Sequence, residues 1–264
     1  MKVAIIGFGA IGRALAEGIA STGTTLVGVL EREEAAAAAR ERLPASIAVT
    51  SVLDELLALE PAVVVECAGH AALRASGARV LRAGRDLIVA SVGALASPEL
   101  EAELRSAAEA GGRIIIPCGA LGGLDALGSA KRAGLDAVHY VSRKAPVAWS
   151  GTKAESLIDL ASVTKPQVFY EGTAREAALD FPQNANVVAA VALAGIGFDR
   201  TRVKLMVDPN TPGNRHLVTA SGPFGELSAE VLARTLPDNP KTSMLAPYSL
   251  LRAVANQSDR LVIS

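Results

Sequence analysis

The chain has 264 residues, which suits about two domains of ordinary size and is long enough to bury a substantial core. Half of the residues are hydrophobic and a fifth are charged, and 26 basic against 27 acidic residues leave a net charge of −1, which excludes a disordered chain and a strongly basic surface. Five Phe, one Trp and three Tyr are too few for a platform that stacks nucleic-acid bases, so we expect a small-molecule partner and no nucleic acid.

The first 118 residues alternate short β-branched runs with segments rich in Ala, Leu, Glu and Arg. This alternation is typical of a parallel sheet with crossover helices. Strands are predicted at 2–6, 26–30, 47–50, 62–67, 86–90 and 113–117. Ser51, three residues before Asp54, and Ser97, directly before Pro98, are expected to cap the helices that follow them. Six strands indicate an α/β fold, a doubly wound sheet of the Rossmann type.

After Cys118 the regular alternation of strand-like and helix-like segments ends in a stretch with several glycines, which indicates a domain boundary. Strand-like runs at 137–142, 167–170, 203–207, 216–220 and 227–232 surround a helical stretch at 186–196. This pattern predicts a smaller α+β domain, interpreted as a substrate domain, with a mixed sheet and helices on one face. An amphipathic helix at 243–255 could pack back on the first domain. We therefore expect domains at 1–118 and 119–240, with residues 241–264 completing the first.

A glycine-rich motif, Gly7-Phe8-Gly9-Ala10-Ile11-Gly12, directly follows the first strand and opens a helix. In this context Gly7 allows a tight turn, Gly9 allows the backbone to approach a pyrophosphate, and Gly12 allows close packing of helix on strand. The helix beginning at Ala10 and Ile11 presents free N–H groups to the phosphates. The motif predicts a dinucleotide site, against the alternative of a tight turn without a ligand.

The second predicted strand ends at Glu31, nineteen residues beyond Gly12 and close to the usual spacing of a ribose-binding acid. A carboxylate there accepts hydrogen bonds from the ribose and repels a 2′-phosphate, which favours NAD. Arg32 could pair with that phosphate, so NADP remains possible, although Arg32 could equally be a solvated surface residue.

Small residues follow two other predicted strands, at Cys67 to His70 and at Ser91 to Ala94, where ligands bind in open α/β sheets. Cys67 follows an apolar run and is interpreted as a packed thiol rather than a nucleophile. His70 could cap the next helix or contact the nicotinamide.

Two features in the second half carry polar chemistry. Asn184 and Asn186 stand at a proline-set turn before a very apolar helix, where one of them could simply be the N-cap. His216 is one of three histidines and follows a turn rich in Pro and Gly. Because imidazole exchanges protons near neutral pH, His216 is our candidate base for an oxidation, with a bystander role as the alternative.

Two cysteines cannot form a disulfide framework, and their spacing fits no zinc site, so we expect a reducing cytoplasm and no metal. The longest apolar stretch, 187–198, is shorter than the roughly 18 residues that a spanning helix needs, so no membrane segment is expected.

The whole chain resembles the L-aspartate dehydrogenase family. The motifs that carry the resemblance occur in order as GFGAIG, VVECAGH (64–70), SVGAL (91–95), PCGALGGLDAL (117–127), RKAPVAWSGT (143–152), FPQNANV (181–187), DPNTPGNRH (208–216) and NPKTSMLAPYS (239–249). By this resemblance Ala120 and Asn186 are nicotinamide-cofactor contacts and His216 is the active-site histidine. Cys118 departs from the serine that the family pattern often has, a change that affects packing only.

The resemblance implies oxidation of L-aspartate with NAD(P) to iminoaspartate, which hydrolyses to oxaloacetate and ammonia or feeds the biosynthesis of NAD. The two substrate carboxylates need cations or amide donors, and the candidates are Asn214, Lys241, Thr242 and Ser243, although Lys241 could be a solvated lysine. We expect the rate to rise with pH as the imidazole of His216 becomes neutral. The resemblance also implies a homodimer through the sheet of the second domain.

Three alternatives remain open from the sequence. A dihydrodipicolinate reductase-like protein shares the first domain but would carry a paired-histidine motif, which this sequence lacks. A homoserine dehydrogenase-like protein also shares the first domain. A catalytically silent sensor of NAD would bind the cofactor without oxidising a substrate.

Overall fold

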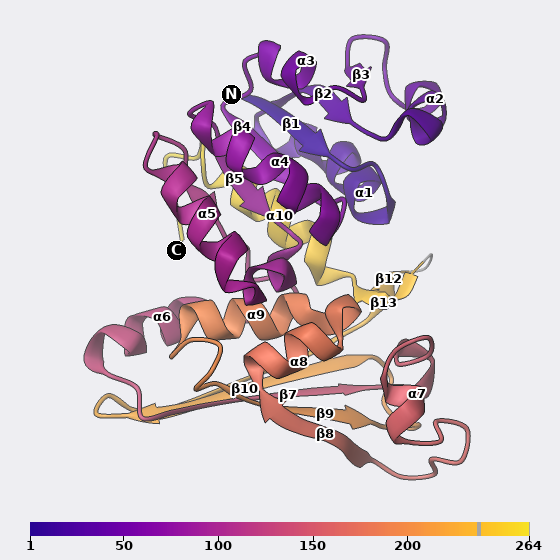
Figure 1. The fold of residues 1–264 in the computed structure, drawn as a ribbon, viewed down its shortest axis with the longest axis vertical. Coiled ribbons are helices and arrows are strands. Elements are labelled where there is room, and N and C mark those ends of the chain that lie inside the picture. Colours follow the sequence, from indigo (N-terminus) through magenta and orange to yellow (C-terminus); the bar gives the residue numbers. More distant parts are fainter. Residues whose placement is uncertain (237–238, 264) are drawn as a thin grey trace. The chain divides into compact units, whose positions relative to one another are not determined.

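The computed structural model describes residues 1–236 and 239–263. The chain divides into two compact units, which we call unit 1 (Met1–Pro117 with Pro247–Ser264) and unit 2 (Cys118–Ala246). Each unit contains its own main sheet (Figure 1).

Unit 1 contains a six-stranded sheet in the order β3-β2-β1-β4-β5-β6, in which every pair of neighbours is parallel. The strands are β1 (Lys2–Ile6), β2 (Thr25–Leu30), β3 (Ala48–Thr50), β4 (Val63–Glu66), β5 (Asp86–Val89) and β6 (Ile114–Ile115). All six predicted strands are present, and the Rossmann-type fold is confirmed. The strand order reverses between β1 and β4, which is where open α/β sheets bind their ligands.

Helices connect these strands: α1 (Ala10–Gly18), α2 (Glu33–Arg42), α3 (Leu53–Ala58), α4 (His70–Arg82) and α5 (Pro98–Ala108), with short 3-10 helices η1 (Ile19–Thr22) and η2 (Val92–Ala96). A further helix, α10 (Leu245–Ala255), comes from the end of the chain. Leu250 and Val254 of α10 are buried in one cluster with Val3 and Ile5 of β1, because the apolar stripe of the amphipathic helix needs a partner. The last helix thus helps to build the core of unit 1.

The two predicted helix caps had different outcomes. Ser97 precedes α5, and its hydroxyl accepts a hydrogen bond from the N–H of Leu100, so this cap is confirmed. The prediction for Ser51 is wrong: α3 begins at Leu53 after Val52, and no side chain caps it. The hydroxyl of Ser51 donates instead to Glu33, 2.6 Å away.

Unit 2 contains a five-stranded sheet in the order β11-β10-β7-β9-β8. The strands are β7 (Ala137–Lys144), β8 (Gln167–Thr173), β9 (Arg202–Val207), β10 (Asn214–Gly222) and β11 (Gly225–Ala233). Because β7 and β9 are parallel and the other neighbours are antiparallel, the predicted mixed sheet is confirmed. The sequence did not indicate the small two-stranded sheet of β12 (Thr235–Leu236) and β13 (Asn239–Ser243).

Three helices of unit 2 lie over one face of this sheet, α6 (Leu124–Ala133), α8 (Ala174–Asp180) and α9 (Ala185–Ala194), as Figure 1 shows. The remaining helical segments are α7 (Ala154–Leu157), η3 (Pro146–Ala148) and η4 (Pro182–Asn184). Burial alternates along β7 and β10, so one face of the sheet is covered and the other is more exposed. The covered face includes polar residues at one end, which form the site described below.

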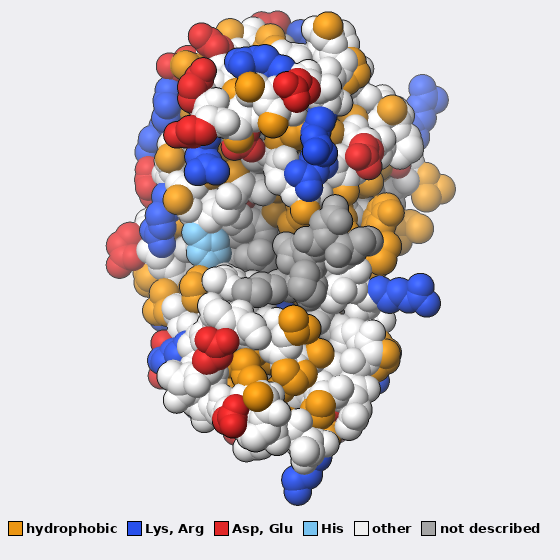
Figure 2. Space-filling view, turned by 90° about the vertical axis from the view of Figure 1, so that its right-hand side faces the viewer, with side chains coloured by type: hydrophobic (Ala, Val, Ile, Leu, Met, Phe, Trp, Pro, Cys, Tyr) orange, Lys and Arg blue, Asp and Glu red, His pale blue; other side chains and the backbone are white. Residues whose placement is uncertain are grey.

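Within the described ranges, no helix combines the length and apolar character that crossing a bilayer requires. On the face drawn in Figure 2, acidic and basic side chains are intermixed over the surface, as the nearly balanced charge of the sequence leads us to expect.

Candidate functional site

The glycine-rich loop after β1 has the geometry of a phosphate-binding turn. Gly7 has φ +94°, and a Cβ there would lie 2.6 Å from Ala68. A Cβ at Gly12 would lie 2.1 Å from the carbonyl oxygen of Gly7, so these two positions require glycine. Gly9 has no atom within 4 Å of an added Cβ, which leaves open space at the start of α1. The loop therefore fits a dinucleotide pyrophosphate, with Ala10 and Ile11 in the first turn of the helix.

Glu31 follows β2 and lies beside this loop. Its carboxylate accepts hydrogen bonds from the backbone N–H of Phe8 at 2.7 Å and of Arg32 at 2.9 Å. The two side chains differ in exposure, at 14% for Glu31 and 84% for Arg32, and their charged groups are 3.9 Å apart. The structure thus brings the predicted ribose acceptor and the glycine-rich loop together, with Arg32 extending into solvent.

Glu66, at the end of β4, is a functional candidate that the sequence did not indicate. Its buried carboxylate accepts hydrogen bonds from the N–H groups of Ala68 and Gly69 and from both the N–H and the hydroxyl of Ser91. Burial raises the pKa of Glu66, and these hydrogen bonds partly oppose that effect. Glu66 thereby fixes the two loops that follow β4 and β5 at the ligand-binding edge of the sheet.

Cys67 and His70 lie in the first of these loops. The thiol of Cys67 donates a weak hydrogen bond to the carbonyl of Gly7 at 3.3 Å, and burial together with the charges of Glu66 and Glu31 raises its pKa far above the ordinary value. Cys67 is therefore an inert packed thiol, as predicted. His70 is the first residue of α4, one position after the N-cap residue Gly69.

His216, the predicted base, lies on β10 with its side chain buried at 3% exposure. Its Nδ1 is hydrogen-bonded to the phenolic oxygen of Tyr140 on β7, 2.6 Å away. Burial, and next the positive charge of Lys144, lower the pKa of His216 to about 3. The imidazole is therefore already neutral across the neutral range, and titration of His216 by itself supplies no reason for the rate to rise with pH there.

Lys144 ends β7 on the same face of the sheet as Tyr140. Its ammonium group donates to Oδ1 of Asn184 at 2.6 Å and lies 5.4 Å from the centre of the Trp149 ring. Burial lowers the pKa of Lys144 to about 8. Asn184 occupies the N-cap position of α9, but its side chain caps no N–H group and contacts Lys144 instead.

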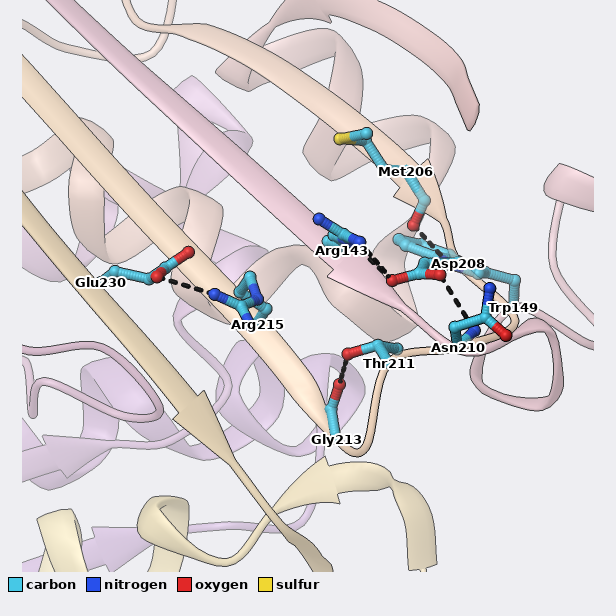
Figure 3. Close-up of polar contacts among 9 residues, drawn as sticks. All are labelled: Arg143, Trp149, Met206, Asp208, Asn210, Thr211, Gly213, Arg215 and Glu230. Atoms are coloured by element: carbon cyan, nitrogen blue, oxygen red, sulfur yellow. Dashed lines mark hydrogen bonds and ion pairs between the residues drawn. The ribbon is translucent and has the colours of Figure 1, made fainter. Parts of the chain in front are cut away.

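The turn that leads into β10 is held by Asp208, as Figure 3 shows. The buried carboxylate of Asp208 pairs with Arg143 at 2.6 Å and accepts a hydrogen bond from the N–H of Asn210. The hydroxyl of Thr211 closes the turn on the carbonyl of Gly213. This network fixes the backbone just before β10 and so positions its first residues, from Asn214 to His216.

The other predicted contacts of unit 2 occupy varied positions. Asn214 is buried at the start of β10, on the same face as His216. Ala120 is buried in the segment before α6, and Asn186 is an exposed residue in the first turn of α9. Thr242 and Ser243 belong to β13, where the Ser243 hydroxyl accepts from the N–H of Leu245. The side chain of Lys241 lies outside the described part of the chain.

Comparisons with known proteins identify the family. Residues 125–257 match the model described as "Aspartate dehydrogenase, C-terminal", and residues 7–117 match "Homoserine dehydrogenase, NAD binding domain". An L-aspartate dehydrogenase from Polaromonas sp. (strain JS666) is 41% identical over 269 residues, covering 100% of both chains. The chain belongs to the aspartate dehydrogenase family. It is therefore an NAD(P)-dependent oxidoreductase.

Two further aspartate dehydrogenases support this family assignment. The L-aspartate dehydrogenase of Pseudomonas aeruginosa (strain PAO1) is 41% identical over 266 residues and covers 100% of both chains. The crystal structure of aspartate dehydrogenase from Thermotoga maritima superposes with a TM-score of 0.77 at 25% identity, covering 100% of this chain and 99% of that one. The match to the homoserine dehydrogenase model is confined to the NAD-binding domain, which that enzyme class shares with this family.

Proposed function

We propose that this protein oxidises L-aspartate to iminoaspartate with NAD, and that the imine then hydrolyses to oxaloacetate and ammonia. The observation that carries the proposal is the buried pair of His216 and Tyr140 in a chain that aligns with L-aspartate dehydrogenases over its full length. In the reaction the substrate ammonium loses a proton, and the Cα–H bond breaks as its electron pair leaves with the hydrogen. An NAD cofactor held by the glycine-rich loop and Glu31 would supply the hydride acceptor for this bond cleavage.

His216 is the proposed base, and its tautomer decides whether it can act. To accept a proton at Nε2, the neutral imidazole must carry its hydrogen on Nδ1 and donate it to the oxygen of Tyr140, 2.6 Å away. Burial raises the pKa of Tyr140 well above its ordinary value, so the phenol remains protonated and directs its own hydrogen elsewhere. Tyr140 is thus the proposed positioning residue for the base.

The cofactor is proposed to be NAD in preference to NADP. Gly7, Gly9 and Gly12 supply a loop that fits the pyrophosphate, and Glu31 supplies a nearly buried ribose acceptor. The high exposure of Arg32 leaves it available for a 2′-phosphate, which supports limited use of NADP. Ala120 and Asn186 are proposed as further cofactor contacts, on the family resemblance.

We also propose a homodimer formed through the exposed face of the unit 2 sheet, in the reducing cytoplasm. Val141, Met206 and Leu217 are partly exposed on that face, and Leu232 is 45% exposed beside them in the register of the strands. Both cysteines are free thiols. Size-exclusion chromatography with light scattering measures the assembly, and a monomer at micromolar concentration would contradict the dimer.

The test of the activity is formation of NADH, followed by absorbance, with purified protein and L-aspartate at alkaline pH. We expect NADH formation to depend on L-aspartate and to exceed that with L-homoserine. Binding of NAD without any substrate oxidation would instead favour the silent sensor.

A further inference from the structure

Lys144 is a buried cation whose charge is not balanced within its unit. Its side chain is 4% exposed, and among the described residues of unit 2 no carboxylate pairs with it. Its contacts are with the neutral amide of Asn184 and the ring of Trp149. Because a buried charge without a counter-ion is costly, its persistence indicates an anion that joins it in function.

The arginines nearby in the sequence are different. Arg143 pairs with Asp208, and Arg215 pairs with Glu230 at 2.8 Å, as Figure 3 shows. The alternation of β7 and β10 places both arginines on the face of the sheet opposite Lys144 and His216. Their charges are neutralised by the protein, so they do not compete with Lys144 for an anionic ligand.

Two buried amide groups at the same end of the covered face lack acceptors. Lysine can only donate, so the Lys144 contact fixes the oxygen of Asn184 toward Nζ and leaves its Nδ2 group as a donor without a partner. Nδ2 of Asn214, on a side chain 2% exposed, also has no partner. Buried donors are normally satisfied, so two such groups together point to a missing acceptor.

These groups share one face with the proposed base. In the register of β7 against β10, His216 lies opposite Ser142, and Asn214 and Lys144 each lie two residues further toward the same end. Side chains two apart on a strand point to the same side. Asn184 adds the N-terminal end of α9, where the helix dipole favours negative charge.

We propose that Lys144, Asn184 and Asn214 form a cradle for one carboxylate of the dicarboxylate substrate, beside His216. This inference rests on the proposed function, and it names binding residues that neither the resemblance nor the sequence supplied, apart from Asn214. The ammonium group of Lys144 and the Nδ2 groups of Asn184 and Asn214 can donate to the two oxygens of a carboxylate. The bound carboxylate is then the counter-ion that Lys144 lacks. The charge of Lys144 then orients the substrate, while His216 accepts the proton.

The first test uses isothermal titration calorimetry to measure binding of succinate, the dicarboxylate that lacks the amine. The protein is saturated with NADH beforehand. We expect Lys144→Met to weaken succinate binding by about 30-fold to 100-fold, because a charge-assisted hydrogen bond is lost. Lys165→Met is the matched control, since Lys165 is an exposed lysine in a loop of the same unit, and it should bind succinate like the wild type. Both variants should bind NADH normally.

Asn184→Asp is the second variant, chosen because it is isosteric and therefore expected to fold. It places a carboxylate where the amide oxygen now accepts from Lys144, so it supplies an internal counter-ion and repels the substrate. Succinate binding should fall by at least tenfold. Wild-type succinate affinity in both Lys144→Met and Asn184→Asp would overturn the cradle.

Because succinate binding needs no turnover, the experiment tests the proposed cradle and the proposed activity independently. A protein that oxidises L-aspartate normally while both variants keep wild-type succinate affinity and an unchanged KM overturns the cradle alone. A protein that binds succinate through Lys144 but forms no NADH from L-aspartate overturns the proposed activity and supports the cradle.

Discussion

The glycine-rich loop of unit 1 and the polar face of unit 2 are built in different ways. The loop consists of six consecutive residues, and its shape depends on backbone torsions and on close contacts that only glycine permits. The polar face joins side chains that are far apart in the sequence, since Tyr140 and His216 are separated by 76 positions and Lys144 and Asn184 by 40.

This difference determines what a substitution should do in each place. At Gly7 and Gly12 of the loop an added Cβ collides with neighbouring backbone, so cofactor affinity and stability should change together, whereas Gly9 has open space around it. On the polar face a substitution removes a proton acceptor, a charge or a hydrogen bond, so catalysis or substrate affinity should change while the cofactor still binds. Each prediction below tests one side of this contrast.

The largest effect is expected for His216→Ala. If His216 is the base, kcat should fall by about 10² to 10⁴, because one positioned proton acceptor contributes about that much, while NAD affinity stays near that of the wild type. Steady-state kinetics and NAD binding by fluorescence measure the two quantities. His139→Ala is the control, since that histidine is exposed on β7. A near-normal kcat in His216→Ala would exclude the base assignment.

Gly12→Ala is expected to have the next largest effect. Its Cβ would lie 2.1 Å from the carbonyl oxygen of Gly7, a backbone atom that cannot move without opening the loop. We expect NAD affinity to fall by about 100-fold and the free energy of unfolding to fall by about 2 kcal/mol. This loss is opposite in sign to the stabilisation that replacing glycine by alanine usually gives within a helix. Calorimetric titration and thermal melting check both.

Gly9→Ala is expected to affect cofactor binding without affecting the stability of the loop. The added methyl group meets no atom within 4 Å, so the melting temperature should remain that of the wild type. NAD affinity should nevertheless fall, because the methyl group takes the space through which the pyrophosphate approaches. Unchanged NAD affinity would mean that the pyrophosphate lies elsewhere.

The pH dependence of substrate binding tests the charge on Lys144. Lys144, with a pKa of about 8, is positive below that pH and neutral above it, so its hold on a carboxylate weakens as pH rises. The inhibition constant of succinate against L-aspartate should therefore increase above pH 8, approaching tenfold per pH unit. His216, with a pKa of about 3, and Tyr140, with a raised pKa, share this face and do not titrate in that range.

Lys144→Met serves as the control for this pH dependence. The variant should bind succinate weakly at every pH from 7 to 10, without the upward turn. A constant inhibition constant in the wild type over the same range would show that the charge of Lys144 does not act on the ligand.

The smallest effects concern the choice between NAD and NADP. Glu31→Ser removes a ribose acceptor and a repelling charge, so the ratio of kcat/KM for NAD to that for NADP should fall by about tenfold. Arg32→Ala should lower the use of NADP by a few-fold, because its charge is largely screened by solvent. Equal losses with both cofactors would make Arg32 a bystander, and an unchanged ratio in Glu31→Ser would place cofactor selection elsewhere.

The predictions for unit 1 agreed closely with its structure because they rested on local features of the sequence. The apolar runs predicted all six strands, and with them the position of Glu31 directly after β2. The prediction for Ser51 was wrong because its hydroxyl had a competing partner, Glu33 on the neighbouring helix. Glu66 was missed because only the packed sheet brings the loop after β5 within reach of its carboxylate.

In unit 2 the sequence predicted His216 but not its surroundings. Arg143 and Lys144 are adjacent cations, and nothing local tells which one faces the helices. The alternation Val138, Tyr140, Ser142, Lys144 carries that information once β7 is known to be covered on one face.

By itself, the sequence determined the family, the order of the strands along the chain and the glycine-rich loop. Those features depend on residues that are neighbours in the chain, so composition and spacing reveal them. Only the tertiary structure decided that Lys144 is buried without a counter-ion, that Tyr140 is hydrogen-bonded to His216, and that Asp208 fixes the turn before β10. Burial and long-range pairing set the charge and basicity of these groups, and both arise only when distant strands and helices come together.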